Sequence, residues 1–114
     1  SSINPVVILP EALAERGDKI AEEFAASCLM GAGQFCTNPG LVLLLAGGAT
    51  DQFIADVTKR FESAPAGTLL GGGVEKSLAA GIRTIREAGA TLLTGDKEAD
   101  AARFCRANTL LKVD

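Results

Sequence analysis

Two short aliphatic runs, residues 6–9 and 41–45, most constrain how this chain can fold. The first reads Val-Val-Ile-Leu and stands between Pro5 and Pro10, and the second reads Leu-Val-Leu-Leu-Leu. Proline cannot donate within a ladder, so the two prolines bracket a short strand. Strands that are apolar on both faces are typical of parallel sheets whose faces are covered. We therefore predict two buried, parallel strands.

Three further stretches carry apolar residues at three- and four-residue spacing, which is typical of amphipathic helices. A short helical segment, residues 11–16, is interrupted by Gly17, after which Asp18 is placed to cap the first long helix. Thr50 is expected to cap the second helix, and Gly89 to follow the third as its C′ residue. The predicted helices cover residues 18–30, 50–61 and 74–88.

The last part of the chain is expected to return to the sheet. Residues 91–94, Thr-Leu-Leu-Thr, predict a third strand, residues 95–102 a polar turn, and residues 103–113 a fourth strand. On the third helix, Leu78, Ile82 and Ile85 are expected to face inward. The order β-α-β-α-α-β-(β) indicates an α/β fold, an open, mostly parallel Rossmann-like sheet with helices packed on it.

Composition excludes several classes of partner. The net charge of −3 leaves no basic surface for nucleic acid. The longest apolar run, Leu41 to Ala46, is strand-sized and far below the roughly 18 residues that span a bilayer. With no His, mixed-ligand zinc sites and Cys-His or Ser-His catalysis are excluded within these residues, and we expect no metal. Three cysteines, an odd number, fit a reducing cytoplasm better than a disulfide framework.

The three cysteines have different predicted surroundings. Cys28 lies on the inward face of the first long helix and Cys105 in a predicted strand, so both are expected to be small buried hydrophobes. Cys36 lies in a loop, where a substrate could approach. Composition and position alone leave a structural role and a chemical role open for Cys36.

Two glycine clusters are candidates for phosphate binding. Gly31-x-Gly33 follows a helix, whereas a dinucleotide fingerprint follows a strand and opens a helix, so this reading is rejected. Residues 71–73, Gly-Gly-Gly, precede a helix and could hold an anion weakly. A plain flexible loop is the favoured interpretation of this second cluster.

The motif around Cys36 resembles the cysteine signature of aldehyde dehydrogenases, in which Gly-Gln precedes the nucleophile. It reads GQFCTNPG at residues 33–40. With the opening SSINPVVILP, residues 1–10, it is similar to the subgroup that oxidises 2,5-dioxovalerate. Bacterial fatty aldehyde dehydrogenases share the Phe-Cys-Thr core, and TLLTG at residues 91–95 is a weaker match to a later strand of the same domain. The resemblance implies that residues 1–114 are part of the cysteine-bearing catalytic domain.

This resemblance implies a reaction and a role for Cys36. Its thiolate would attack a small aldehyde to form a thiohemiacetal, hydride would pass to NAD(P)⁺, and water would hydrolyse the resulting thioester. The backbone N–H of Cys36 would form part of the oxyanion hole. The implied reaction of the parent enzyme converts 2,5-dioxovalerate to 2-oxoglutarate with NADP or NAD; a fatty aldehyde substrate is the alternative within the family.

The same resemblance assigns the remaining machinery to sequence outside this chain. The general-base Glu would fall just before Ser1, and the cofactor-binding and oligomerisation segments are also expected elsewhere. We therefore expect the 114-residue fragment to hold no cofactor and to be inactive, and the parent to be a cytoplasmic homo-oligomer. A stand-alone, non-catalytic Rossmann-like binding module is the competing interpretation, because a small α/β domain with a loop cysteine fits it equally well.

Overall fold

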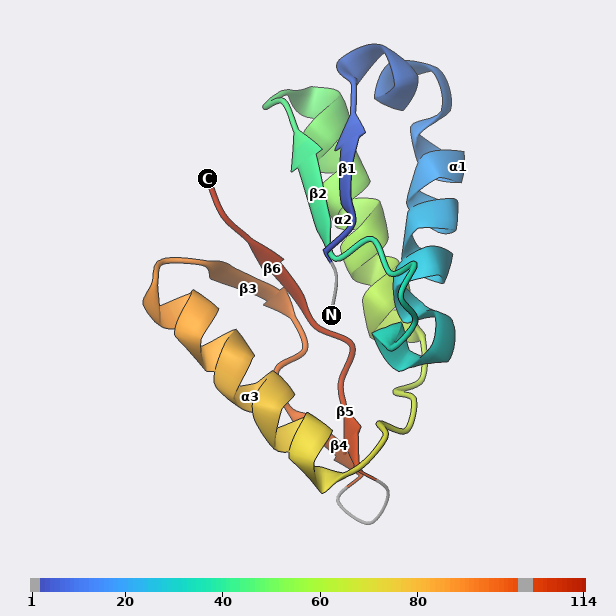
Figure 1. Cartoon of the computed structure of the whole chain (residues 1–114). Helices are drawn as coiled ribbons and strands as arrows, with labels where there is room; N and C mark the ends of the chain where they lie inside the picture. Colours follow the sequence, from blue (N-terminus) through green and yellow to red (C-terminus); the bar gives the residue numbers. More distant parts are fainter. Residues whose placement is uncertain (1–2, 101–103) are drawn as a thin grey trace. The chain divides into compact units, whose positions relative to one another are not determined.

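The computed structural model describes residues 3–100 and 104–114. The chain divides into two compact units, Ser1–Arg60 and Phe61–Asp114. Helices and short sheets are present in both, which confirms the predicted α/β class (Figure 1). No helix among the described residues is both long enough and apolar enough to cross a membrane.

The first unit is built on two parallel strands. Strand β1 (Pro5–Ile8) pairs with β2 (Leu41–Leu44) in a register that runs from Pro5↔Leu41 to Ile8↔Leu44. The two arrows point the same way in Figure 1, as the sequence predicts. Parallel strands cannot be joined by a tight turn. The crossover here is helix α1 (Pro10–Leu29) followed by the short 3₁₀ helix η1 (Met30–Gly33).

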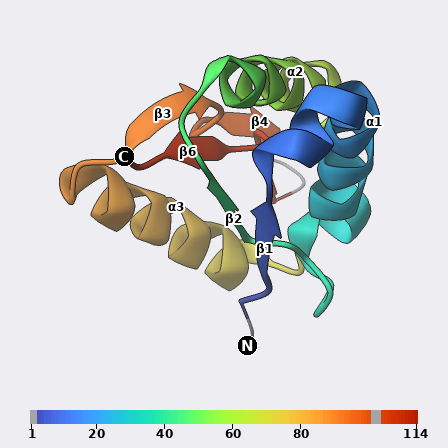
Figure 2. The ribbon, with the colours of Figure 1, turned by 90° about the horizontal axis from the view of Figure 1, so that it is seen from above.

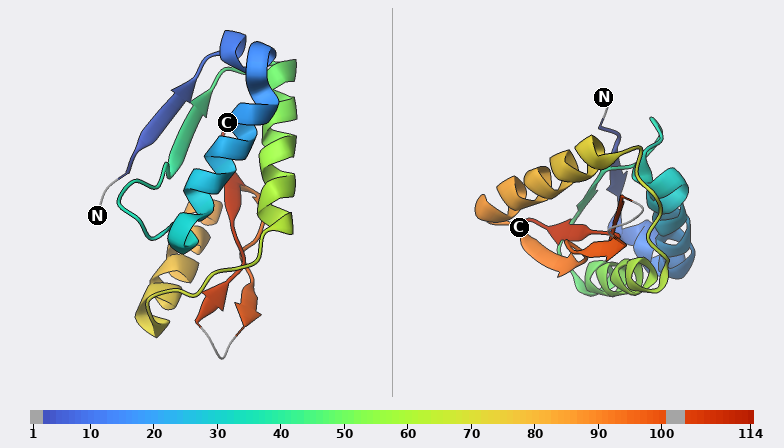
Figure 3. Two further views of the ribbon diagram at one scale, coloured as in Figure 1. Left: turned by 90° about the vertical axis from the view of Figure 1, so that its right-hand side faces the viewer. Right: turned by 90° about the horizontal axis from the view of Figure 1, so that it is seen from below.

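Helix α1 and helix α2 (Gly48–Ser63) lie along one face of the strand pair (Figure 3). The rings of Phe24 and Phe53 meet between the helices, with centroids 5.8 Å apart and planes inclined at 56°. Val57 is 1% exposed. The buried apolar side chains of this unit are Ile8, Leu13, Ala21, Phe24, Ala25, Phe53 and Val57. The core of the first unit is thus mostly aliphatic, with one aromatic pair at its centre.

The other face of the strand pair keeps its aliphatic side chains exposed. Val7 is 64% exposed and Leu43 is 50% exposed. Side chains alternate between the two faces of a strand, so helices on one face bury only every second residue. The prediction that both strands are buried is therefore wrong for this face, while the prediction of parallel pairing is confirmed.

The break predicted in the first helix is present. Pro10 is the first residue of α1, where a missing N–H removes no helical bond. Arg16 leaves the helical region, with φ −150° and ψ 40°, one residue before the Gly17 that the sequence singles out. The chain thus forms a short segment and a longer helix, as predicted.

Thr50 does not cap α2 as predicted. The helix begins at Gly48, so Thr50 lies inside its first turn. Its buried hydroxyl donates to the carbonyl oxygen of Leu45 at 2.5 Å. The side chain therefore ties the end of β2 to the start of the helix, a role that depends on the turn between them.

The second unit is a helix followed by antiparallel strands. Helix α3 (Gly72–Glu87) starts two residues earlier than predicted and ends before Gly89, whose φ of 116° and N–H bond to the Arg86 carbonyl fit the predicted C′ role. Of the three side chains expected to face inward, Ile82 is 5% exposed, whereas Leu78 and Ile85 are 39% and 47% exposed. One helical position, rather than a full stripe, is buried.

The strands of this unit correct the expectation of a mostly parallel sheet. Strand β3 (Thr91–Thr94) pairs antiparallel with β6 (Leu110–Lys112), and β4 (Glu98–Asp100) pairs antiparallel with β5 (Cys105–Arg106). Figure 2 shows β3 beside β6. The predicted polar turn over 95–102 contains β4, and the predicted fourth strand over 103–113 is two strands; residues 101–103 lie outside the described residues. Among the described residues, parallel pairing is confined to β1 and β2.

A sharp bend separates the two strand pairs. Gly95 and Asp96 have φ of 96° and 54°, so the chain turns through the left-handed region between β3 and β4. A Cβ at Gly95 would lie 2.6 Å from the Cα of Thr109 and would collide with the backbone oxygen of Asn108. The N–H of Asp96 donates to Thr109 Oγ1 at 2.9 Å. Only glycine fits this bend, because both the backbone angle and the facing backbone exclude a side chain.

Asp96 also joins the helix to the strands. Its carboxylate accepts hydrogen bonds from Arg106 at 2.9 Å and from Arg86 at 2.6 Å. The bond from Arg106, then that from Arg86, holds the pKa of Asp96 below its ordinary value of 3.8. One carboxylate at the bend therefore fixes α3 against β5.

We predict that Gly95→Ala lowers the free energy of unfolding by about 2 kcal/mol or more, because strained backbone and overpacking each cost roughly 1–3 kcal/mol. Gly81→Ala is the matched control, since a Cβ there meets nothing within 4 Å inside α3. The control should stabilise by about 0.5–1 kcal/mol, because alanine is the better helix former. Denaturant titration measures both, and equal effects of the two variants would contradict the fit described for Gly95.

We also predict a pH-dependent effect of Asp96→Asn. The pKa of Asp96 is lowered in the folded chain, so its stabilisation is complete above the unfolded value near 3.8 and is lost as pH falls through the lower folded value. The wild-type chain should therefore be more stable than the variant at pH 6, and the difference should shrink towards pH 2. An equal difference in unfolding free energy at both pH values would rule out the charge pairing as its source.

Candidate active site

Cys36 lies on an exposed loop, residues 34–40, between η1 and β2. The loop is preceded by three consecutive left-handed residues, Gly31, Ala32 and Gly33, with φ of 58°, 56° and 76°. Glycine adopts this region readily, whereas a residue with a Cβ loses roughly 1–2 kcal/mol there. The left-handed run ends the helical crossover and sends the chain back towards the strands (Figure 1). The predicted position of Cys36 in an accessible loop is confirmed.

Hydrogen bonds within the loop keep it compact. The backbone N–H of Asn38 donates to the Phe35 carbonyl at 3.1 Å, and its side-chain amide donates to the Gly33 carbonyl at 3.1 Å. The N–H of Gly40 donates to the Asn38 carbonyl at 2.9 Å. Cys36 is therefore carried on a short folded loop rather than on an extended connection.

Asn4 connects this loop to the first strand. Its Nδ2 donates to the carbonyl oxygen of Cys36 at 2.7 Å and to that of Asn38 at 2.9 Å. Asn4 stands immediately before β1, whose first residue, Pro5, is paired with Leu41, the first residue of β2. Asn4 has no role among the sequence-based predictions. Its place in the opening Ser-Ile-Asn-Pro stretch was the available signal, but its partners could not be seen without the strand register.

Phe35 lies beside the nucleophile candidate. Its side chain is 54% exposed. Its ring covers Gly31 so closely that a Cβ at Gly31 would be 2.5 Å from the ring atom Cε2. The aromatic ring thus packs on the Gly31 backbone and leaves about half of its apolar surface exposed.

The other two cysteines are less accessible. Cys28 is partly buried at the end of α1, with Sγ 3.6 Å from the Pro39 carbonyl oxygen, and burial raises the pKa of its thiol to about 11. Cys105 is 5% exposed in β5, near Thr68 Oγ1 at 3.8 Å. The predicted structural setting of Cys105 is confirmed, and Cys28 is half-buried rather than fully inward. Cys36 is the exposed cysteine of the three.

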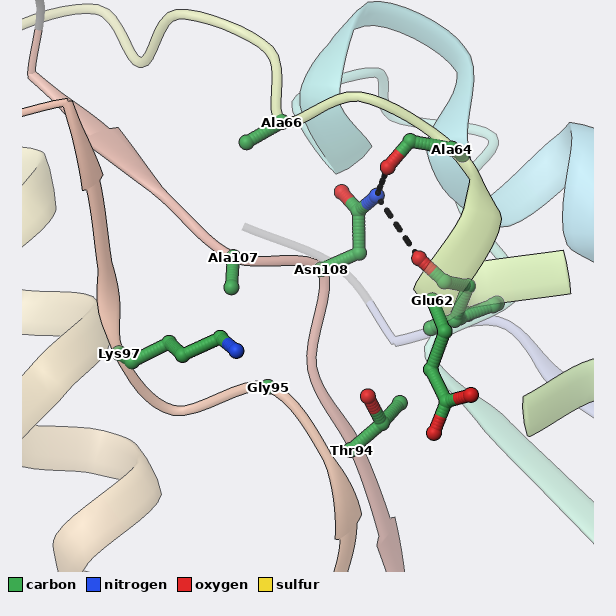
Figure 4. Close-up of a pocket in the computed structure, with 9 residues that line it drawn as sticks. Glu62, Ala64, Ala66, Thr94, Gly95, Lys97, Ala107 and Asn108 are labelled. Atoms are coloured by element: carbon green, nitrogen blue, oxygen red, sulfur yellow. Dashed lines mark hydrogen bonds between the residues drawn. The ribbon is translucent and has the colours of Figure 1, made fainter. Parts of the chain in front are cut away.

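The second unit contains a small pocket of about 220 Å³ (Figure 4). Lys97 and Glu62 contribute charges to its lining, and Asn108 forms part of one wall. The amide of Asn108 is turned towards the end of α2, donating to the carbonyls of Ala64 at 3.1 Å and Phe61 at 3.3 Å. The volume is below the roughly 300–1,000 Å³ usual for ligand pockets. We therefore assign Asn108 a structural role and not a ligand-binding one.

No family model matches the chain. It is 51% identical to alpha-ketoglutaric semialdehyde dehydrogenase 2 of Azospirillum brasilense over 74 residues, 65% of this chain and 14% of that protein. It is also 44% identical to alpha-ketoglutaric semialdehyde dehydrogenase of Acinetobacter baylyi over 82 residues, 72% of this chain and 16% of that protein. The chain is related to a segment of these dehydrogenases. The resemblance read from the Cys36 motif is thus confirmed, although the matches span only 14% and 16% of the relatives' length.

Relatedness to aldehyde dehydrogenases implies an NAD(P)⁺ cofactor, and the described residues do not form a binding site that fits this dinucleotide. Two helices follow glycines, α2 after Gly47 and α3 after Gly71, and an added Cβ at either glycine meets nothing within 4 Å. The space beside these two glycines is therefore not enclosed by neighbouring protein atoms. Asp51 and Glu75 stand in the first turns, where their negative charge would oppose a phosphate. Among these residues no group of three His, Cys, Asp or Glu side chains is placed to hold a metal ion.

We predict that iodoacetamide modifies Cys36 at least tenfold faster than Cys28 or Cys105. Cys36 is exposed. The thiol of Cys28, with a pKa of about 11, is a thiolate in only about one molecule in a thousand at pH 8, and the thiolate is the form that reacts. Peptide mapping of a short alkylation time course measures the three rates in one sample. Faster labelling of Cys28 would mean that the loop is closed over Cys36 in solution.

Proposed function

We propose that this chain carries the nucleophile of an aldehyde dehydrogenase and that Cys36 is that nucleophile. The observation that carries the proposal is an exposed cysteine on a folded loop, in a chain 51% identical over 74 residues to a protein named as such a dehydrogenase. The non-catalytic alternative is therefore not favoured.

The proposed chemistry begins at the Cys36 sulfur. The thiolate adds to the aldehyde carbon, forming a C–S bond, and the carbonyl oxygen takes the electron pair as an oxyanion. We propose that the backbone N–H of Cys36 contributes to stabilising this oxyanion. Oxidation to the thioester requires a hydride acceptor, for which we propose NAD(P)⁺ bound by segments of the complete protein other than the described residues. Water then cleaves the thioester, releasing the carboxylate and restoring the thiol.

For the substrate we propose 2,5-dioxovalerate, oxidised to 2-oxoglutarate. Both relatives are named alpha-ketoglutaric semialdehyde dehydrogenase, which is the support for this choice over a fatty aldehyde. The groups that bind the substrate carboxylate are proposed to lie in the rest of the protein, as is the general base. We further propose that the complete enzyme is a cytoplasmic homo-oligomer, and that this 114-residue chain alone is inactive.

In the complete protein, Cys36→Ser should lower aldehyde-dependent NAD(P)H formation by about a thousandfold or more, since removing a nucleophile disables the whole catalytic group. Cys105→Ala, at a buried position in β5, is the matched control and should stay within about threefold of wild type. Stopped-flow absorbance at 340 nm measures the rate for each variant. Unchanged turnover in Cys36→Ser would refute the assignment. A larger kcat/KM for a long-chain alkanal than for 2,5-dioxovalerate would refute the substrate.

A further inference from the structure

We propose that Asn4 is a positioning residue for Cys36, orienting the peptide bond that follows the nucleophile. This inference rests on the proposed function, because it assigns Asn4 a part in the same reaction. The Nδ2 bonds of Asn4 go to backbone carbonyls, so Asn4 acts through the backbone on which the thiol is carried.

The strand register brings Asn4 to the loop. Because β1 and β2 are parallel and Pro5 is paired with Leu41, the residues that enter the two strands meet at the same end of the sheet. Asn4 enters β1, and residues 34–40 enter β2. Pro5 follows Asn4 directly and fixes φ at the first strand position, which restricts the backbone that carries the amide. Two segments more than thirty residues apart in sequence are thus joined by one side chain.

The Asn4 amide is fully engaged by two loop carbonyls. Nδ2 has two hydrogens, and it donates to Cys36 O at 2.7 Å and to Asn38 O at 2.9 Å. A trans peptide is planar, so fixing the Cys36 carbonyl also fixes the Thr37 N–H, which points the opposite way. This restricts rotation on the C-terminal side of the Cys36 Cα and therefore the direction in which the thiol is presented.

The hydrogen bonds of Asn38 allow the Asn4 side chain to hold the whole loop. Asn38 is held to Gly33 at the end of η1 and to Phe35 in the loop, so the second Asn4 bond anchors the folded loop rather than a single residue. Those bonds lie within η1 and the loop, whereas the Asn4 bonds attach the loop to the start of β1. Without Asn4 the loop would keep its shape but lose this attachment to the sheet.

The two Nδ2 hydrogen bonds of Asn4 indicate that it positions the loop and does not contact the substrate directly. Both Asn4 hydrogens are directed at carbonyl oxygens, so the amide is not available to donate to the oxyanion of a bound aldehyde. Loss of Asn4 should therefore lower the rate of reaction of bound substrate more than it weakens substrate binding. It should leave the exposed thiol open to a small reagent.

The test compares Asn4→Ala and Asn4→Asp with wild type in the complete protein. Aspartate has the shape of asparagine but, when ionised, has no donor for either carbonyl, so it tests the hydrogen bonds without a cavity. Both variants should lower kcat by about ten- to a hundredfold, the order expected for a displaced reacting group, with KM changed less than about threefold. Alkylation of Cys36 by iodoacetamide should stay within about threefold of wild type in both.

Thr50→Val is the matched control for stability. It removes one side-chain bond to a backbone carbonyl, that of Leu45, in the same unit but away from the Cys36 loop. It should keep kcat near wild type even if its melting temperature falls as much as that of Asn4→Ala. A drop in kcat for Thr50→Val equal to that of the Asn4 variants would show a general stability effect and overturn the proposal.

The outcomes separate this inference from the proposed function. If Cys36→Ser abolishes activity but both Asn4 variants keep wild-type kcat, the positioning role is wrong and the nucleophile assignment stands. If Cys36→Ser keeps activity, the proposed function itself fails, whatever the Asn4 variants do. A rise in KM of tenfold or more at unchanged kcat would also overturn the inference, because it would make Asn4 a substrate-binding residue.

Discussion

The parallel pairing of β1 with β2 is the constraint on which the first unit depends. Parallel strands need a long crossover, and α1 with η1 supplies it. The Phe24–Phe53 contact holds that crossover beside α2, on one face of the pair. The register then determines where the crossover must return, because residues 34–40 have to reach the end of the sheet at which Asn4 stands. The exposed position of Cys36 follows from this return path. The hydrogen bonds from Asn4 attach the returning loop to the start of β1.

The second unit depends on a bend instead of a crossover. Its strands run antiparallel, and the left-handed pair Gly95 and Asp96 divides them into two short ladders. The bend turns the Asp96 carboxylate towards Arg86 of α3 and Arg106 of β5. A local backbone requirement and two ion pairs thus coincide at two adjacent residues. The bend is therefore specified both by its backbone angles and by its ion pairs, although the strands on either side have only three or four residues.

The sequence was sufficient for features that depend on local chemistry. The three helices, the interruption near Gly17, the C′ role of Gly89 and the loop position of Cys36 all follow from spacing, glycine and proline. Burial was harder to predict, because the aliphatic run around Leu43 looks the same whether one face of the strand is covered or both are.

Features that depend on pairing could not be predicted. The antiparallel partners of β3 and β4 are chosen by the bend at Gly95, which reads in sequence as a polar turn. Thr50 looks like a helix cap, yet the turn after β2 directs its hydroxyl to Leu45. Asn4 gains its two bonds only through the register of β1 and β2, so no local pattern could disclose them.

Ala32 has a consequence for how this part of the chain can vary. It is the non-glycine member of a left-handed run, with φ of 56°. The left-handed backbone conformation of Ala32, and not the polarity or size of the side chain, therefore determines which substitutions are tolerated at this position. Glycine, asparagine and aspartate adopt the left-handed conformation readily, while valine, isoleucine and threonine do not. A conservative exchange of one small apolar residue for a β-branched one would be the disruptive change here, and a polar asparagine the tolerated one.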